Sequence, residues 1–478
     1  MAEKPLYLTT TLPYVNADPH IGFALEMVQA DVLARFAKLS GREVFFNTGT
    51  DEHGQKIAQR ALEEGQEPQA YTDAFAAKFG SLKDVLGLSP EIHFIRTTDP
   101  HHVLAAQEMW RRCAEKGDIY KKKYTGLYCV GDEMFLKESD LVNGRCPNHP
   151  NLVPQEIEEE NYFFRLSAYQ EKLESYLSQE GVIVPEWRRQ EALNFVRQGL
   201  EDFSISREKA RLAWGIPVPD DDSQVMYVWF DALTNYISTL GWPEDANGSF
   251  KTFWIDGETL QLAGKDQVRF QSIMWQAMLM SADVKATDRV FYHGFITSDG
   301  QKMSKSLGNV IDPLSIVNEY GTDALRFFLM RHVHPFDDSD VTMERFKEAY
   351  NADLANGLGN LASRIMTLAE KNLPQPVAVE FKPYPAEFTE ALSSYQFNTA
   401  LEYVWNYIQK LDQRINADAP FKVVKTDPEK GKRVIEDLVR ELAFIDEMLE
   451  PVMPQTSGAI IEAIMANKKP ENLFPRKE

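Results

Sequence analysis

The chain has 478 residues, of which 44% are hydrophobic and 26% charged, an ordinary balance for a folded protein. Its length predicts roughly three domains, and its composition excludes a disordered chain or a fibre. The formal net charge of −21, from 51 lysines and arginines against 72 aspartates and glutamates, argues against a general nucleic-acid binder, so any RNA must meet local basic patches.

The bulk sequence also predicts where the protein acts. Residues 1–20 lack the basic start and apolar run of a secretion signal, and no stretch is long and apolar enough to cross a bilayer, so we expect a cytoplasmic protein without membrane contact. Three cysteines cannot build a disulfide framework. Candidate basic patches, each typical of solvated surface when taken alone, are Lys121, Lys122, Lys123, the lysines of residues 301–306, Lys422, Lys425, Lys430, Lys432, Arg433 and Arg440.

The start of the chain reads as strand, helix and strand. Residues 5–12 form a short apolar run, and apolar side chains then recur at helical spacing from Leu25 to Leu39, just before Gly41. A second apolar run follows at residues 44–48. This order predicts a parallel sheet whose carboxyl strand ends carry the ligand-binding residues.

Residues 116–225 interrupt this pattern with a lysine run, two cysteine hooks and many acidic positions. Strand-like and helical segments resume at residues 226–230, 253–255 and 290–292, and from about Met343 onward only helical periodicity remains. We therefore expect an α/β domain in two halves, residues 1–115 and 226–342, with residues 116–225 inserted between them and a helical domain at residues 343–478.

The segment between the first strand and its helix offers a phosphate site. A helix N-terminus presents open N–H groups and a positive dipole end to an anion. His20 can donate to a phosphate oxygen, and Gly22 lacks the Cβ that would keep a base or ribose away from the backbone. Taken alone, Pro-His-Ile-Gly more often marks an ordinary capped helix.

A glycine-flanked loop at residues 299–309 reads Asp-Gly-Gln-Lys-Met-Ser-Lys-Ser-Leu-Gly-Asn. Lys302 and Lys305 stand three apart on it, so both ammonium groups can swing onto a triphosphate as charge leaves the α-phosphorus. Such a contact is commonly worth about 3 kcal/mol in the transition state, so each lysine should affect turnover more than binding.

The two motifs, in this order, resemble those of class I aminoacyl-tRNA synthetases. Among these the chain resembles the methionyl-tRNA synthetases along its whole length, through residues 12–14 (Leu-Pro-Tyr), 50–54 (Thr-Asp-Glu-His-Gly), 227–232 (Tyr-Val-Trp-Phe-Asp-Ala), 264–266 (Gly-Lys-Asp) and 360–364 (Asn-Leu-Ala-Ser-Arg). The resemblance implies a class I Rossmann-type catalytic domain, a connective insertion and a C-terminal α-helical anticodon-binding bundle.

The resemblance also implies the substrate contacts. Asp51 would bind the ammonium group of methionine, and the methionine pocket would be completed by Leu12, Tyr14, Trp229, Ala232, Leu233, Tyr236, Phe270 and Gln271. ATP would meet Gly22, Phe23, Gly264, Asp266, His293, Lys302 and Lys305, while His20, the two lysines and Mg²⁺ would stabilise the transferred charge. Polarizable sulfur packs well against aromatic rings, which agrees with this pocket.

Three residues depart from the family pattern. Phe23 stands where the first motif usually ends in a second histidine, which leaves His20 and the loop lysines to contact the phosphates. Gln271 replaces a histidine that often lines the methionine pocket; it can hydrogen-bond but cannot titrate. Phe421 replaces a tryptophan that stacks on the anticodon.

Two hooks in the insertion have the spacing of a zinc knuckle. Cys129 and Asp132 form the first hook, and Cys146 and His149 the second. Many relatives have cysteine in place of Asp132, and aspartate is a harder and weaker zinc ligand than thiolate. A structural Zn²⁺ and a metal-free remnant of the knuckle therefore both stay open.

Residues for reading RNA are predicted in the helical domain. Asn360 and Arg364 are four apart and so share one helix face, from which the resemblance implies that they read anticodon bases. Phe421 would offer a stacking surface for a splayed base. Phenylalanine for tryptophan should weaken stacking, worth about 1–3 kcal/mol per base, without abolishing it.

The resemblance implies activation of L-methionine with ATP to methionyl-adenylate and pyrophosphate, then transfer of methionine to the 3′ end of tRNA(Met) for protein synthesis. One alternative is a synthetase for another bulky aliphatic amino acid, but the insertion is too short for the large editing domain of those enzymes. Another is an inactive paralogue that only binds tRNA or partners, prompted by Phe23 and Gln271; Asp51, Lys302 and Lys305 argue against it. No appended dimerisation domain is visible, so we expect a monomer.

Overall fold

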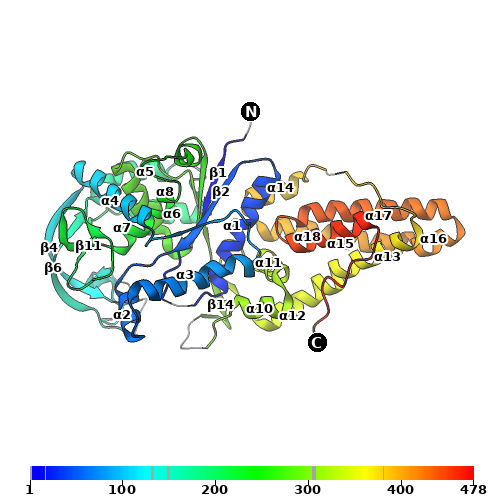
Figure 1. Cartoon of the computed structure of the whole chain (residues 1–478), viewed down its shortest axis with the longest axis horizontal. Helices are drawn as coiled ribbons and strands as arrows, with labels where there is room; N and C mark the ends of the chain where they lie inside the picture. Colours follow the sequence, from blue (N-terminus) through cyan, green and yellow to red (C-terminus); the bar gives the residue numbers. More distant parts are fainter. Residues whose placement is uncertain (1–2, 17, 131–133, 148–150, 304–307, 381) are drawn as a thin grey trace. The chain divides into compact units, whose positions relative to one another are not determined.

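The computed structural model describes residues 3–16, 18–130, 134–147, 151–303, 308–380 and 382–478 (Figure 1). They group into two compact units, each built from several stretches of chain. Unit 1 comprises residues 1–19, 41–81 and 90–292, and unit 2 comprises residues 20–40, 82–89 and 293–478. The division expected from the sequence, an α/β domain in two halves with an insertion and a separate helical domain, stays a prediction.

A six-stranded sheet runs through unit 1 and confirms the α/β class. Its order is β3 (His93–Arg96), β2 (Val44–Thr50), β1 (Leu6–Thr9), β12 (Glu258–Gly264), β13 (Arg289–His293) and β7 (Ile183–Val184). β1 pairs in parallel with β2 on one side and β12 on the other, with Leu8 opposite Phe46 and Leu260. The two halves predicted from the sequence therefore contribute to one sheet.

The parallel strands of this sheet are buried on both faces. All four residues of β1 are buried, and six of the seven residues of β12 are buried as well. Continuous burial along a strand, rather than alternation, is typical of parallel sheets covered on both sides.

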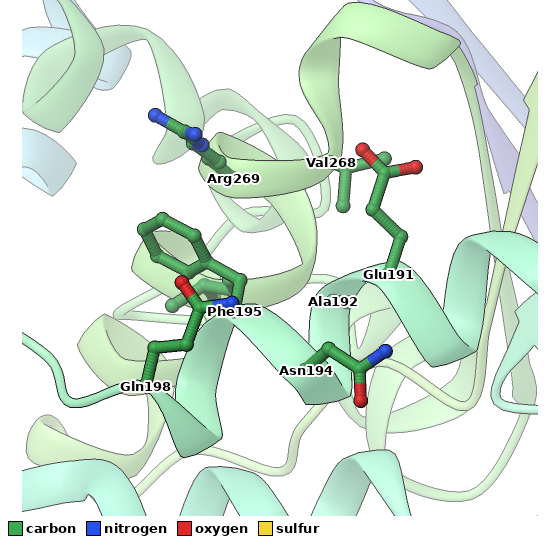
Figure 2. Close-up of a pocket in the computed structure, with 8 residues that line it drawn as sticks. Glu191, Ala192, Asn194, Phe195, Gln198, Val268 and Arg269 are labelled. Carbon is green, nitrogen blue, oxygen red and sulfur yellow. The ribbon is translucent and has the colours of Figure 1, made fainter. Parts of the chain in front are cut away.

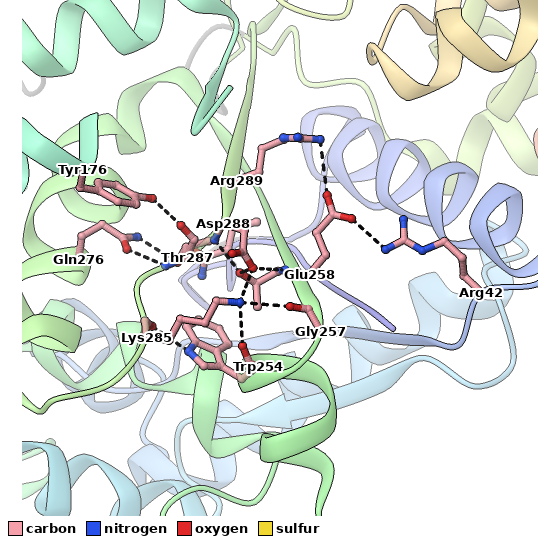
Figure 3. A network of polar contacts seen from close by, with 12 residues as sticks. Arg42, Tyr176, Trp254, Gly257, Glu258, Gln276, Lys285, Thr287, Asp288 and Arg289 are labelled. Atoms are coloured by element: carbon pink, nitrogen blue, oxygen red, sulfur yellow. Dashed lines mark hydrogen bonds and ion pairs between the residues drawn. The ribbon is translucent and has the colours of Figure 1, made fainter. Parts of the chain in front are cut away.

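A polar network joins the amino ends of three strands (Figure 3). Glu258, the first residue of β12, accepts from Arg42 Nη2 at 2.9 Å and forms an ion pair with Arg289 Nη1, in the first residue of β13, at 3.6 Å. Nearby, Lys285 Nζ donates to the carbonyls of Trp254 and Gly257, both at 3.1 Å. These contacts fix the edge of the sheet opposite the carboxyl strand ends.

The inserted region adds antiparallel structure to unit 1. One sheet has the order β5 (Met134–Leu136), β4 (Ile119–Cys129), β6 (Gln155–Phe164) and β8 (Phe203–Ser204), and another the order β10 (Pro217–Val218), β11 (Asp221–Met226) and β9 (Ser206–Glu208). The helices of this unit are α2 (Gln55–Glu63), most of α3 (Pro68–Val85), α4 (Pro100–Glu115), α5 (Gln170–Leu177), α6 (Glu186–Arg197), α7 (Val228–Leu233), α8 (Asn235–Ser238) and α9 (Trp275–Ser281).

Unit 2 is mostly helical. Its helices are α1 (Ile21–Leu39), α10 (Pro313–Tyr320), α11 (Thr322–Arg331), α12 (Met343–Ala349), α13 (Asn360–Asn372), α14 (Ala386–Ser393), α15 (Phe397–Asp418), α16 (Pro420–Thr426), α17 (Pro428–Leu449) and α18 (Pro454–Ala466). A small sheet of β15 (Gln301–Lys302), β14 (Ile296–Ser298) and β16 (Ser339–Asp340) precedes α12. Beyond β16 the described residues contain no strand, as the helical periodicity predicts. None of the helices described is both long and apolar enough to span a membrane.

A fully buried arginine ties α1 into unit 2. Arg326, on α11, donates to Asp31 Oδ2 of α1 at 2.8 Å and to the carbonyls of Leu86 and Val452 at 3.0 and 2.6 Å. Both side chains of the Arg326–Asp31 pair have no exposed surface. A buried charge needs such partners because its desolvation is costly.

Candidate active site

The carboxyl ends of β1 and β2 are joined by backbone hydrogen bonds. Asp51, directly after β2, donates its N–H to the carbonyl of Pro13 at 3.0 Å, and its own carbonyl accepts from Val15 N–H at 3.2 Å. Tyr14 thereby lies beside Asp51 in a parallel bridge. The Asp51 side chain is largely buried, so its carboxylate meets little water. Two of the residue groups predicted for methionine therefore meet at this edge of the sheet.

Aromatic side chains predicted for the methionine pocket also come together. The rings of Trp229, on α7, and Phe270, which begins a π-helical segment Phe270–Met274, stack with centroids 3.8 Å apart and planes 10° apart. Ala232, Leu233 and Tyr236 are buried on α7 and α8. This confined apolar environment suits a thioether.

Gln271, which departs from the family pattern, is accommodated by a tyrosine. Its Nε2 donates to Tyr236 Oη at 2.6 Å, and the side chain is buried. Among the residues described, its Oε1 has no hydrogen-bond partner. A buried amide with an unused acceptor has capacity for one more polar contact.

The peptide that follows β2 is anchored by a buried glutamate. Arg96 donates to Glu52 Oε1 and Oε2 at 2.7 and 2.8 Å, and Thr50 and Thr98 each donate a hydroxyl to the same carboxylate at 2.6 Å. The hydrogen bond to Glu52 is the main reason that the pKa of Arg96 lies above its ordinary value. Asp51 thus sits on a backbone that charge-assisted bonds hold in place.

The next residue, His53, belongs to a buried cluster that sequence reasoning did not identify. His53 Nδ1 lies 2.7 Å from Asp231 Oδ2, and His102 Nε2 lies 2.8 Å from Asp231 Oδ1. Burial would raise the pKa of Asp231, yet the charge of His53 and the hydrogen bonds from both histidines hold it below its ordinary value. The three residues are far apart in the sequence, and the only available signal was the place of His53 and Asp231 inside the motif segments at residues 50–54 and 227–232.

The start of α1 corrects the expectation of open N–H groups. Ile21 N–H donates to the carbonyl of Ile311 at 3.0 Å, Gly22 N–H to His20 Nδ1 at 3.1 Å, and Phe23 N–H to the carbonyl of His20 at 3.0 Å. His20 is therefore the N-cap of α1, and the first amides are used inside the protein. The dipole end of the helix remains available to an anion, but its first three N–H groups do not.

The same geometry gives Gly22 a role besides the ATP contact expected from the sequence. A Cβ at this position would lie 2.8 Å from Cε1 of His20, so the missing side chain makes room for the capping histidine ring. Because His20 Nδ1 accepts a hydrogen bond, a neutral ring carries its proton on Nε2 and can donate from there. Phe23 flanks the ring with centroids 4.4 Å apart.

Other residues predicted to contact ATP are divided between the units. In unit 1, Gly264 ends β12 and Asp266 is exposed shortly after it. In unit 2, Lys302 lies on β15, which pairs with β14, and Lys305 lies outside the described residues. The bond from Ile21 to Ile311 joins the start of α1 to the segment that follows the lysine loop.

His293 is engaged by protein groups at both ring nitrogens. Nδ1 lies 2.8 Å from the carbonyl of Gly294, and Nε2 lies 2.9 Å from Glu26 Oε2 on α1. Since a carbonyl only accepts, Nδ1 carries a proton, and a further proton is shared between Nε2 and the carboxylate. Glu26 is thus a buried partner of His293 that the helical periodicity of α1 did not indicate.

A pocket of about 320 Å³ opens elsewhere in unit 1, between α6 and the segment before Phe270 (Figure 2). Glu191 and Phe195 line it from α6, and Arg269 lies over the Phe195 ring at 4.5 Å. None of its lining residues is among those predicted to bind substrate.

The structure describes two of the four residues predicted to bind zinc. Cys129 and Cys146 are both fully buried in one small cluster with Leu136, whereas Asp132 and His149 lie outside the described residues. Within the residues that the structure describes, no group of three metal-ligating side chains is found. Two thiols in one cluster fit half of the proposed donor set.

The predicted RNA-reading residues lie on α13 and α16. Asn360 is exposed at the start of α13, and Arg364 donates from Nη2 to Asn416 Oδ1 at 2.8 Å and from Nη1 to Asp412 Oδ1. Phe421 follows on α16 and is 44% exposed. The Arg364 contacts therefore connect α13 to the end of the helix that leads to Phe421.

Comparison with known proteins gives consistent matches. A family model described as tRNA synthetases class I (M) matches residues 6–152 and 150–366. Methionine–tRNA ligase of Caldanaerobacter subterraneus subsp. tengcongensis is 40% identical over 97% of this chain and 74% of that protein, and the enzyme of Rhizobium meliloti is 40% identical over 96% and 92%. The solved structure of Mycobacterium tuberculosis methionyl-tRNA synthetase in complex with methionyl-adenylate has a TM-score of 0.88, 35% identity and 99% coverage of both chains.

Proposed function

Because the chain belongs to the methionine–tRNA ligases, a family of class I aminoacyl-tRNA synthetases, we propose that Asp51, Trp229 and Phe270 bind the amino acid. The enzyme activates methionine with ATP to methionyl-adenylate and pyrophosphate and transfers methionine to tRNA. Leu12, Tyr14, Ala232, Leu233, Tyr236 and Gln271 complete the pocket.

One observation carries this assignment: a buried carboxylate at the end of β2 lies beside Tyr14 in the same unit as the Trp229–Phe270 stack. The carboxylate of Asp51 supplies the charge for the substrate ammonium, and the stacked rings supply a polarizable surface for sulfur. One methylene in an apolar pocket discriminates only about 10- to 200-fold, so shape and the polar contact of Gln271 must act together.

For the phosphates, we assign His20, Lys302 and Lys305 to charge stabilisation during in-line attack of the methionine carboxylate on the α-phosphorus. Gly22 and Phe23 contact ATP beside His20, while Gly264, Asp266 and His293 contact the nucleoside. Mg²⁺, bound to ATP as co-substrate, supplies further charge neutralisation. Catalysis of this kind depends on positioning and preorganised charge, with no covalent protein intermediate.

For tRNA(Met), Asn360 and Arg364 read anticodon bases and Phe421 stacks on one of them. The exposure of Asn360 and Phe421, and the anchoring of Arg364 by Asn416, support this assignment. Splayed single-stranded loops are usually recognised by such a combination of polar side chains and an aromatic ring.

We further propose that Cys129, Asp132, Cys146 and His149 hold a structural Zn²⁺. The enzyme acts as a monomer in the cytoplasm, the compartment where its product is used in protein synthesis. Size-exclusion chromatography with light scattering measures the monomer directly.

The deciding experiment is amino-acid-dependent ATP–pyrophosphate exchange with methionine, isoleucine, leucine and valine. We expect exchange with methionine, and a fall in kcat of about 100-fold or more for Lys305→Ala with little change in the KM for methionine. Lys209→Ala, which removes an exposed lysine of unit 1, is the matched control and should behave as wild type. Exchange driven mainly by another amino acid, or an unimpaired Lys305→Ala, would overturn the proposal.

A further inference from the structure

The buried cluster around Asp231 lies behind the proposed methionine pocket. Asp231 and His102 have no exposed surface, and the side chain of His53 is only 8% exposed. The two histidines contact different oxygens of the one carboxylate, at 2.7 and 2.8 Å. A carboxylate so fully removed from water is stable only while both oxygens are hydrogen-bonded.

The hydrogen-bond directions in the cluster are fixed by chemistry. An ionised carboxylate only accepts, so His53 must carry a proton on Nδ1 and His102 on Nε2. The other ring nitrogen of His102, Nδ1, lies 2.9 Å from Ser238 Oγ, which can donate to it. The carboxylate therefore fixes which nitrogen of each ring donates to it, and with it the orientation of the ring.

Except for His102, which lies on α4, the residues of this network lie on segments that carry predicted pocket residues. His53 follows Asp51 by two positions on the peptide after β2. Asp231 lies on α7, between Trp229 and Ala232, and Ser238 ends α8, which carries Tyr236. The cluster thus connects the backbone next to Asp51 to the two short helices, α7 and α8, that carry Trp229, Ala232, Leu233 and Tyr236.

α7 and α8 have few means of holding this position by themselves. They contain six and four residues, and neither has a side-chain cap. Helices this short are not stable alone and depend on tertiary contacts. The bonds from α4, through His102, and from β2, through His53, supply such contacts.

We propose that Asp231 is a positioning residue for methionine, which sets the distance between Asp51 and the Trp229–Ala232–Leu233 wall through its bonds to His53 and His102. This inference rests on the proposed function, since it takes that pocket as the amino-acid site. It assigns Asp231 no contact with substrate.

Asp231→Asn tests the proposal with almost no change in shape. An amide has only one oxygen, so it cannot accept from both rings, and the bond that remains loses its charge assistance. We expect the KM for methionine in pyrophosphate exchange to rise between about 10- and 100-fold, while the KM for ATP changes by no more than about twofold. Equal effects on both KM values, or none on methionine, would overturn the proposal.

Two substitutions of His102, to glutamine and to asparagine, test the same proposal if Asp231→Asn does not fold. The amide nitrogen of glutamine reaches the place of Nε2, whereas that of asparagine reaches only the place of Nδ1. His102→Gln should therefore keep the KM for methionine within about twofold of wild type, and His102→Asn should raise it like Asp231→Asn. The same KM in both variants would contradict the positioning role.

The two proposals fail in different ways. If methionine is not the substrate, the wild-type enzyme shows no methionine-dependent exchange. If only the positioning inference is wrong, the wild type is active with methionine and the KM for methionine does not depend on the donor at position 102. Melting temperatures of all variants, measured in parallel, separate a general loss of folding from the selective change in KM.

Discussion

At the scale of single residues, the carboxyl group of Asp446 is buried where its charged form is disfavoured. It is 4% exposed between α17 and α18; Oδ2 accepts from Ser457 Oγ at 3.2 Å, and within the described part of the chain Oδ1 has no partner. Burial, reinforced by Glu450 and Glu447 and only partly opposed by Ser457, raises the pKa of Asp446 to about 8. In the unfolded chain an aspartate ionises near pH 4 (about 3.9). Between these values the unfolded state releases a proton that the folded state keeps, so the free energy of unfolding falls as pH rises.

Asp446→Asn removes this dependence. Relative to wild type, the variant should gain stability by up to about 1.4 kcal/mol for each pH unit between about pH 5 and about pH 8. Urea unfolding at both pH values measures the gain, and Asp437→Asn, which changes an exposed carboxylate of α17, is the control. A difference from wild type that is the same at both pH values would show that Asp446 does not titrate in this window.

At the scale of elements, the antiparallel sheet of the insertion depends on what holds the end of β4. Cys129 closes that strand and Cys146 packs with it, so a Zn²⁺ bound there would add stability to the sheet. We expect about one zinc per chain by elemental analysis, and a lower melting temperature after chelation. Cys146→Ser should lose the metal and reproduce the effect of the chelator. A stoichiometry near zero would leave a metal-free knuckle held by packing.

Also at this scale, the sequence predicted the elements whose signal is local. β2 and α1 follow from apolar runs and helical spacing, and the loop after β1 from its motif. By contrast, β7 is only two residues long, too short for a periodic signal, and residues 253–255 lie in a π-helical turn rather than a strand. Long-range pairs such as Asp231 with His102 could not be predicted, because their partners are 129 residues apart and no local pattern connects them.

At the scale of the whole molecule, the residues proposed to bind the amino acid and those proposed to read the anticodon belong to different units. The proposed amino-acid pocket belongs to unit 1, and Arg364 belongs to unit 2. Arg364→Ala should therefore lower kcat/KM for tRNA charging by about 10- to 100-fold, since loss of a base contact costs about 1–3 kcal/mol, while methionine-dependent exchange is unchanged. Lys371→Ala removes a cation from the far end of α13 and should affect neither reaction. Parallel losses in both reactions would contradict this division.

The assignment of α1 to the mostly helical unit has a mechanical consequence. Arg326 has no exposed surface, so water does not compete for its bonds to Asp31 and Val452, and these bonds tie α1 and α11 to the turn before α18. If the C-terminal helices tilt when they bind RNA, the N-terminus of α1, where His20 lies, would move with them. Under the proposed assignments, His20 would then respond to RNA bound near Arg364 of the same unit, without any refolding.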